Sequence, residues 1–484
     1  MRRLPKATFS RGFYPPRPSR FVIGLLRHIG KLYLRIGQGT RQVKIYNPRP
    51  LYDAFHSFYS GKARLLIVFR HVEVADGPVI MSALTVNLRR LTRSRLHRKR
   101  GGIDGPPLPK KPHSFFLYGK DVLNWAGAGA RWAFPRLGGI PVVNTRLDRA
   151  SHDAIRGAIV AGEHPLALAP EGQVTYQMFH VSELAAGVGT MTRWIEQDLA
   201  EEPQDIMILP IAIGYHLARD HESLIRNVLG RIYRVLGRHP DYSERASVEG
   251  SAGSSAEELF AATDLLLRWL EESYDRAYPS VAPSRGDREA GGADPDTLSR
   301  RIHNICQRIL SVAELGSGGR DRSTLRRLFA SRYRATDLLY REDVAPKRLS
   351  PLARAWANFR ALDALTMDRH SQIIDVLMYV RPAYIAVSPS VHRRAEYALN
   401  LLDVTNRIAG GNIDSRYSPG RKRARLLVGE PIDAGEILRK PGRSAKSAAG
   451  VLNQRVHDDF VELSLALERR MQREITPSEG ERSA

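Results

Sequence analysis

A histidine and an aspartate follow a strongly apolar stretch near residue 70 and could together act as a general base. In the segment IVFRHVEVADGPVI, His71 comes two residues after the end of an expected strand at residues 64–69, and Asp76 comes five residues later. An imidazole takes up a proton near neutral pH, and a carboxylate on its second ring nitrogen fixes the tautomer and stabilises the imidazolium. Such a pair could activate a hydroxyl group for attack on an electrophile.

The spacing of this pair excludes one geometry. On a continuous helix a five-residue step rotates by about 500°, so the two side chains would lie roughly 140° apart and could not pair. We therefore expect His71 in the loop after the strand and Asp76 near the beginning of the next helix, which the following Gly-Pro dipeptide favours. The same spacing recurs at His370 and Asp375, in an apparently helical stretch. The spacing alone is therefore weak evidence that a histidine and an aspartate form a catalytic pair.

Two charged neighbours of His71 have simpler interpretations. Glu73 is a second carboxylate within reach of the histidine, but we expect it to be exposed on the surface. Arg70 directly precedes the histidine and could contact an anionic substrate or be solvated. We expect it to be solvated.

Three further blocks follow the histidine in order, and the set resembles a known family. The blocks are GGIPVVNTR at 138–146, ALAPEGQVT at 167–175 and ILPIAIG at 208–214. Together with His71 and Asp76 they resemble the glycerolipid acyltransferases, which include the glycerol-phosphate and lysophosphatidate acyltransferases. The resemblance covers about residues 43–219, and RLLVGEPIDAGEIL looks like the closing strand and helix of that family.

The resemblance implies an O-acyltransferase of the glycerolipid and phospholipid biosynthesis type. It makes His71 the base and Asp76 its orienting partner, with no metal, no cofactor and no covalent enzyme intermediate. The co-substrate would be acyl-CoA or acyl-carrier protein. The acceptor would be a hydroxyl of a glycerol-phosphate, a lysophospholipid or a related lipid.

The resemblance also implies residues that bind the acceptor. Glu171 and Gly172 match the Pro-Glu-Gly element of the family, which helps to bind the polar acceptor. Arg146 is the candidate phosphate-binding arginine, since a guanidinium can donate two charge-assisted hydrogen bonds to a phosphate. Arg149 is its rival, because two residues separate the apolar run from Arg146. A Gln-Val pair stands where many members have Thr-Arg, so the acceptor stays open.

The formal net charge of +23 implies an anionic partner. A membrane surface, a nucleic acid and phosphate-bearing substrates all fit this charge. The basic stretch at 93–111 has no interleaved aromatic residues, which disfavours nucleic acid. We therefore expect an anionic membrane surface, the acyl donor and the lipid acceptor as partners.

The sequence predicts a cytoplasmic protein associated peripherally with the inner face of the membrane. No apolar run approaches the roughly 18 residues that span a bilayer, the N-terminus is a poor match to a signal peptide, and the single cysteine, Cys306, is consistent with a reducing compartment. Residues 21–36 show the apolar and basic pattern of an interfacial amphipathic helix. A helix packed on the domain itself explains this pattern as well.

Apolar strands alternate with helices from residue 43 onward, which predicts an α/β fold with a mostly parallel or mixed sheet flanked by helices. Long helical patterns without clear strands follow, and a strand pattern then returns, so a large helical insertion is expected before the last strand. The expected parts are a basic arm with an amphipathic helix at 1–42, the acyltransferase core at 43–219, the insertion at 220–422 with a disordered stretch near 279–296, the closing strand and helix at 423–474, and a disordered tail at 475–484.

A non-catalytic protein is the alternative prediction. It would keep the acyltransferase fold and bind a membrane or a nucleic acid through its basic surface. Composition permits this interpretation, whereas the four ordered blocks favour the enzyme.

Overall fold

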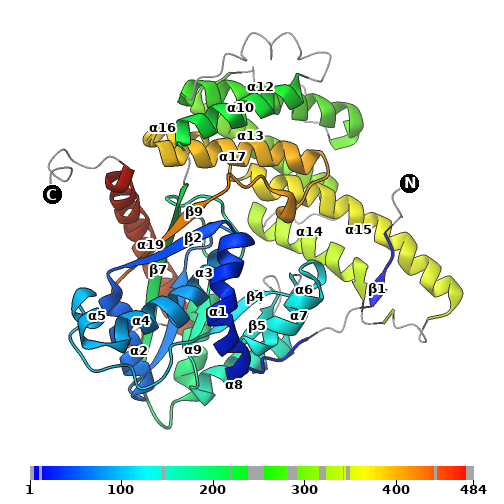
Figure 1. Cartoon of the computed structure of the whole chain (residues 1–484). Coiled ribbons are helices and arrows are strands. Elements are labelled where there is room, and N and C mark those ends of the chain that lie inside the picture. Colours follow the sequence, from blue (N-terminus) through cyan, green and yellow to red (C-terminus); the bar gives the residue numbers. More distant parts are fainter. Residues whose placement is uncertain are drawn as a thin grey trace. The chain divides into compact units, whose positions relative to one another are not determined.

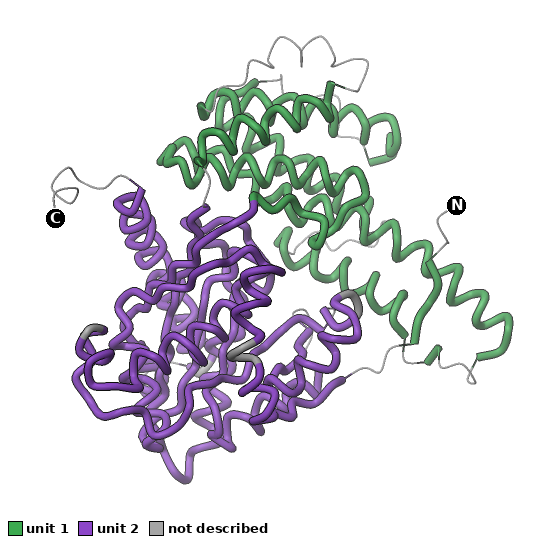
Figure 2. Tube along the Cα trace, in the orientation of Figure 1, with its two compact units in different colours: residues 1–12, 219–419 green, residues 13–218, 420–484 purple. Residues whose placement is uncertain are grey.

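The computed structural model describes residues 5–9, 13–120, 122–143, 148–217, 220–237, 255–281, 292–314, 323–341, 343–344, 349–440 and 444–475. The chain forms two compact units (Figure 2): an α/β unit of residues 13–218 and 420–484, and a helical unit of residues 1–12 and 219–419. The predicted arm is therefore divided between the two units. The predicted disorder at 279–296 and 475–484 falls mostly on residues outside this description.

One mixed sheet forms the centre of the α/β unit (Figure 1). Its strands are β2 (Thr40–Tyr46), β3 (Ala63–Phe69), β4 (Phe115–Gly119), β5 (Gly139–Val142), β6 (Leu166–Leu168), β7 (Asp205–Leu217), β9 (Lys422–Val428) and β10 (Ile432–Asp433). The order is β2-β9-β7-β3-β6-β4-β5, and β10 also pairs with β7. Strand β7 pairs antiparallel with β9 and β10, and the other neighbours are parallel. The predicted fold class is confirmed.

Strand β3 is covered on both faces, which explains its nearly unbroken apolar sequence ARLLIVF. Successive side chains of a strand point to opposite faces of the sheet. Leu66 and Val68 belong to a core cluster with residues of α8 (Arg149–Ala161), α9 (Gly187–Asp198) and α19 (Ala445–Ile475). Helix α2 (Pro48–Tyr59) also packs against β3. This buried strand is a rigid support for the loop that follows it.

The carboxyl end of β3 is a topological switch point. The chain runs from β3 to β4, β5 and β6 on one side of β3 and then crosses to β7 on the other side. Open α/β sheets bind their ligands outside the carboxyl ends of the strands at such a point. His71 and Asp76, which follow β3 in the chain, therefore lie where this fold class places a site.

Shorter helices complete the α/β unit. They are α1 (Arg20–Ile36), α3 (Asp76–Ser82), η1 (Ala83–Leu88), α4 (Arg89–Arg93), α5 (Arg95–Arg100), α6 (Val122–Trp125), α7 (Gly127–Arg136) and α18 (Ala434–Leu438). Helices α3, η1 and α4 follow one another directly, with a π-helical segment in the middle. None of the helices in the described residues combines the length and the apolar character that crossing a bilayer requires.

The helical unit confirms the predicted helical insertion. Its helices are α10 (His221–Leu236), α12 (Ala256–Ala277), α13 (Pro295–Ala313), α14 (Thr324–Leu339), α15 (Pro351–Leu377), α16 (Pro382–Val387) and α17 (Val391–Ile408), with short η2 (Pro279–Val281) and η4 (Ile413–Ser415). Two short strands, β1 (Thr8–Phe9) and β8 (Tyr340–Arg341), pair in parallel. Most of these helices begin at a Ser or Asp whose side chain accepts a hydrogen bond from a backbone N–H of the first turn, and such N-caps define where each helix begins.

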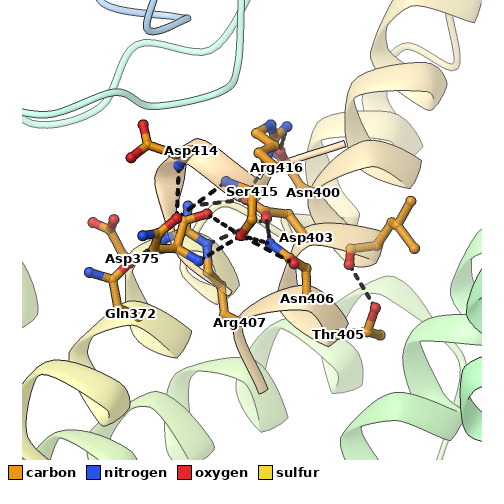
Figure 3. Close-up of polar contacts among 12 residues, drawn as sticks. Gln372, Asp375, Asn400, Asp403, Thr405, Asn406, Arg407, Asp414, Ser415 and Arg416 are labelled. Atoms are coloured by element: carbon orange, nitrogen blue, oxygen red, sulfur yellow. Dashed lines mark hydrogen bonds and ion pairs between the residues drawn. The ribbon is translucent and has the colours of Figure 1, made fainter. Parts of the chain in front are cut away.

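A buried polar cluster joins α15, α17 and the turn after α17 (Figure 3). The Asp403 carboxylate accepts from Arg416, with Nη1 at 2.8 Å from Oδ2, and from Arg407, with Nη2 at 3.3 Å. Arg416 also donates to Asn400 at 2.7 Å, and Arg407 donates to Gln372. Burial raises the pKa of Asp403, but the two guanidinium groups outweigh it and lower the pKa overall. Each of these charged side chains has a polar partner within the cluster, so we interpret this cluster as structural.

Candidate active site

The His71 imidazole and the Asp76 carboxylate are hydrogen bonded, with Nδ1 3.1 Å from Oδ2. His71 lies in the loop after β3, and Asp76 is the first residue of α3. The His71 side chain is 25% exposed, whereas the Asp76 side chain is fully buried. In the described part of the chain, no hydrogen-bond partner contacts Nε2 of His71. The predicted geometry is confirmed, and Nε2 can take up a proton.

Asp76 is held in place by two further donors. The Tyr215 hydroxyl donates to Oδ1 at 2.6 Å, and the Glu73 N–H donates to Oδ2 at 2.7 Å. Burial raises the pKa of the Asp76 carboxyl, and the hydrogen bonds from His71 and Tyr215 oppose this shift. Burial and the neighbouring carboxylate raise the pKa of Tyr215 well above its usual value. Tyr215 therefore stays a neutral donor, and the carboxylate is oriented toward Nδ1.

Arg70 is fully buried, so the expectation that it is solvated is wrong. Its Nε donates to Oε1 of Glu171 at 2.7 Å, and its Nη1 donates to the Ser464 hydroxyl at 2.8 Å. Its Nη2 donates to the carbonyl oxygens of Gln177 at 3.1 Å and His180 at 2.6 Å. A buried guanidinium needs this many acceptors because leaving water is costly for a charge. Arg70 thus ties the end of β3 to α19 and to the segment after β6.

Glu171 supports the backbone of His71. Its Oε2 accepts from the His71 N–H at 2.5 Å, while Oε1 is held by Arg70. Its side chain is 1% exposed, and in this structure its two oxygens hold the Arg70 guanidinium and the His71 backbone. Gly172 turns the chain after Glu171 with a positive φ of 73°, a conformation that glycine adopts without steric cost. The predicted acceptor contact of these two residues stays a prediction.

The structure leaves open the choice between the two arginines expected at the phosphate. Arg146 lies outside the described residues. The Arg149 side chain is 96% exposed at the start of α8 and lies 3.9 Å from Asp153, one turn later on the same helix. In the structure as described, the choice between the two arginines therefore stays a prediction.

Glu73 is only partly exposed, where an exposed side chain was expected, and as expected it is not the partner of His71. Its side chain is 32% exposed and forms an ion pair with Lys422, the first residue of β9. Lys422 also lies 4.8 Å from the centroid of the Tyr215 ring. These contacts bring a strand that follows the helical unit in the chain to the edge of the candidate site.

The second pair with the same spacing has no such geometry. His370 and Asp375 both lie within α15, and His370 is hydrogen bonded instead to the hydroxyls of Tyr274, at 2.6 Å from Nδ1, and Tyr278, at 3.1 Å from Nε2. Asp375 accepts from Arg332 at 3.0 Å. This confirms that an aspartate five residues after a histidine does not pair with it within a helix.

Comparison of the chain with family models and with curated proteins identified no relative. No family model matches the chain, and no curated protein matches it. The resemblance to the glycerolipid acyltransferases therefore stays a prediction. Among the described residues, no group of three or more His, Cys, Asp or Glu side chains could hold a metal ion.

Sequence reasoning missed several supporting residues, namely Tyr215, Ser464 and Lys422. Tyr215 could have been found, because it follows the fourth block in the same strand and strand β7 pairs directly with β3. The positions of Ser464 and Lys422 depend on the long return of the chain through the helical unit. The sequence predicts the returning strand and helix at 423–474, but no local pattern indicates that Ser464 and Lys422 contact this site.

Proposed function

We propose that the chain is an O-acyltransferase that moves a fatty acyl group from an acyl thioester to a hydroxyl of a glycerol-phosphate, lysophospholipid or related lipid. The observation that carries the proposal is the His71–Asp76 hydrogen bond at the carboxyl end of β3. The order of the four sequence blocks supports it. The thioester carrier is CoA or acyl-carrier protein.

The reaction needs one base that later acts as an acid. Nε2 of His71 takes the proton of the acceptor hydroxyl while the hydroxyl oxygen forms a bond to the thioester carbonyl carbon. The tetrahedral intermediate then collapses, the bond from carbon to sulfur breaks, and the leaving thiolate takes the proton from the imidazolium. Asp76 stabilises the imidazolium throughout. Because the acceptor oxygen attacks the thioester carbon directly, no residue of the chain is acylated.

The supports beneath His71 suit this chemistry. Glu171 fixes its backbone, and the Asp76 carboxylate fixes its ring. A base whose geometry is set before substrate binds loses little entropy in the transition state. Because Asp76 is fully buried, its interaction with the imidazolium is weakly screened by water.

The charge distribution favours an anionic partner close to this site. The first 120 residues contain 25 Lys and Arg but only four Asp and Glu. This segment includes β3, His71 and Asp76. Acyl-CoA, acyl-carrier protein and anionic lipids are all attracted by such a field.

Helix α1 is the proposed contact with the membrane. Val22, Ile23 and Leu34 are buried against the unit, while a second apolar stripe faces outward and consists of Phe21, Leu25, Ile29, Leu32 and Ile36. The exposed basic residues Arg20, Lys31 and Arg35 lie on the same helix. An exposed apolar stripe beside basic side chains is typical of a helix that lies in a bilayer interface. One face of α1 thus packs on the unit, and the exposed face supports the proposed contact with a membrane.

Vesicle binding tests this contact. Wild type should sediment with vesicles that contain phosphatidylglycerol and much less with pure phosphatidylcholine. Leu32→Asp should weaken the sedimentation by about tenfold or more, since it places a charge where an apolar side chain would enter the interface. Sedimentation equal to that of wild type would remove α1 from the proposal.

A transfer assay tests the catalytic proposal. The purified full chain is incubated with acyl-CoA or acyl-carrier protein and with glycerol 3-phosphate, lysophosphatidate or other lysophospholipids. His71→Ala should lower the transfer rate by a factor on the order of 10²–10⁴, the range for loss of a general base. The matched control is His370→Ala, which removes the other histidine of the same spacing and should leave the rate of the folded protein within about twofold.

The outcomes separate enzyme from binding protein. Failure of wild type with every donor and acceptor, together with intact vesicle binding, would favour the non-catalytic alternative. Equal losses in His71→Ala and His370→Ala would show that the rate reports on folding and not on a base.

A further inference from the structure

Lys422 is a buried cation beside the candidate dyad. Its side chain is 8% exposed, and its backbone is fixed on both sides, by pairing with Leu217 of β7 and with Thr40 of β2. Its ammonium forms an ion pair with Glu73 and lies over the ring of Tyr215. A lysine is rarely buried so far unless a specific partner compensates its charge.

The Glu73 carboxylate could compete with the Asp76 carboxylate for the His71 imidazole. Glu73 is two residues from His71 and its side chain is 32% exposed, and its own N–H donates to Asp76. A free carboxylate at this position could reach the imidazole from the solvent side. It would then stabilise the imidazolium in a second orientation and leave Nε2 misplaced for the acceptor.

We infer that Lys422 is a positioning residue that captures the Glu73 carboxylate, so that Asp76 remains the one carboxylate partner of His71. The inference rests on the proposed function, because the orientation of the ring matters for transfer only if His71 is the base. Lys422 also contacts the ring of Tyr215, the second donor to Asp76. One side chain from β9 thus stabilises both neighbours of the dyad.

The charged surroundings of His71 come from several elements. Asp76 and Glu73 belong to its own loop and the start of α3, Tyr215 to β7 and Lys422 to β9. Glu171 contacts the backbone of His71 from the segment after β6. Burial lowers the pKa of Lys422 to about 7. The Lys422 ammonium is therefore about half charged at neutral pH, and its ion pair with Glu73 weakens as the pH rises through this value.

Carbethoxylation of His71, followed by peptide mass spectrometry, measures the imidazole directly. The reagent diethyl pyrocarbonate reacts with the neutral ring, so the pH midpoint of labelling reports the pKa of His71. In the full-length Lys422→Met variant this midpoint should rise by about 0.5 to 1 pH unit, because the released carboxylate stabilises the imidazolium. In the same variant kcat should fall about tenfold, with a smaller change in KM, as expected when one charge-assisted hydrogen bond of the dyad is weakened.

The double variant Lys422→Met/Glu73→Gln separates positioning from folding. Because the competitor is removed, the labelling midpoint should return to the wild-type value and most of kcat should be recovered. Lys422→Arg, which keeps the charge, should resemble wild type at about pH 6, where Lys422 is mostly protonated. An unshifted midpoint in Lys422→Met, or no recovery in the double variant, would overturn the inference. Because labelling needs no turnover, the test stands even if no transfer is found.

A second comparison applies if Lys422→Met does not fold. An arginine stays charged at all accessible pH values, so Lys422→Arg keeps the ion pair above pH 8, where wild type loses it. Wild type should then show a decline in rate between pH 7 and 9 that Lys422→Arg lacks. Identical alkaline profiles of the two proteins would contradict the inference.

Discussion

His71 and His370 are each followed five residues later by an aspartate. The first histidine is hydrogen bonded to its aspartate, and the second is not. In the α/β unit the imidazole and the carboxylate are hydrogen bonded across a loop and a helix start. In the helical unit both residues lie on α15, where two tyrosine hydroxyls hold the histidine and an arginine holds the aspartate. The backbone conformation between the two residues therefore decides whether this spacing can form a dyad.

Removing the charge of each aspartate should give the largest difference between the two pairs. Asp76→Asn should lower kcat by a factor on the order of 10³–10⁴, because an amide can no longer select the productive tautomer or stabilise the imidazolium. Asp375→Asn should leave kcat within about twofold and should lower only stability. Steady-state kinetics of both variants, with circular dichroism to verify folding, checks this. Comparable kinetic losses would mean that the pairs do not differ in role.

Two buried arginines extend the comparison to stability. Breaking a buried ion pair by removal of one partner typically costs about 3–5 kcal/mol. Both Arg70→Met and Arg407→Met should therefore lower the free energy of unfolding by roughly this amount. Only Arg70→Met should also reduce kcat of the folded protein, since Glu171 loses the group that fixes it beneath His71. Denaturant titration and kinetics at low temperature separate the two effects.

Substitution of the two tyrosines that contact the pairs should also affect kcat differently, by a smaller factor. Tyr215→Phe removes a hydrogen bond to the buried carboxylate of Asp76, which is worth about 1.5–3 kcal/mol, or roughly 10- to 100-fold in kcat if it acts in the transition state. Tyr274→Phe removes the corresponding bond to His370 and should not change kcat. A Tyr215→Phe variant with the wild-type rate would show that the His71 hydrogen bond alone orients Asp76.

The last difference concerns the pH dependence of stability. Burial lowers the pKa of His370 to about 4, below its usual value of 6.5. Because the folded state disfavours the protonated ring, stability is fully present above pH 6.5 and is lost as the pH falls toward 4. Between pH 7 and 4 wild type should lose about 2–3 kcal/mol more than His370→Gln. Parallel curves of unfolding free energy against pH would contradict this.

The fold could be predicted from the sequence because its strands are short apolar runs separated by helical patterns, as in the stretch before His71. The His71–Asp76 contact could be predicted because helical geometry excludes the alternative arrangement. Arg70 was predicted wrongly because a charge after a buried strand is normally solvated. Its partners, Glu171 and Ser464, lie 101 and 394 residues away in the chain. Local patterns carry no information about contacts over such separations.

The antiparallel pairing of β7 with β9 defines how the helical unit is inserted in the chain. Leu217, the last residue of β7, and Lys422, the first residue of β9, are direct partners in the ladder. Everything between them is, in topological terms, the loop of a β-hairpin. A turn of two residues such as Asn-Gly can connect strands in this way, so a chain shortened at 218–421 should retain the ladder. The dyad and all of its supports, including Lys422, lie on the part that remains.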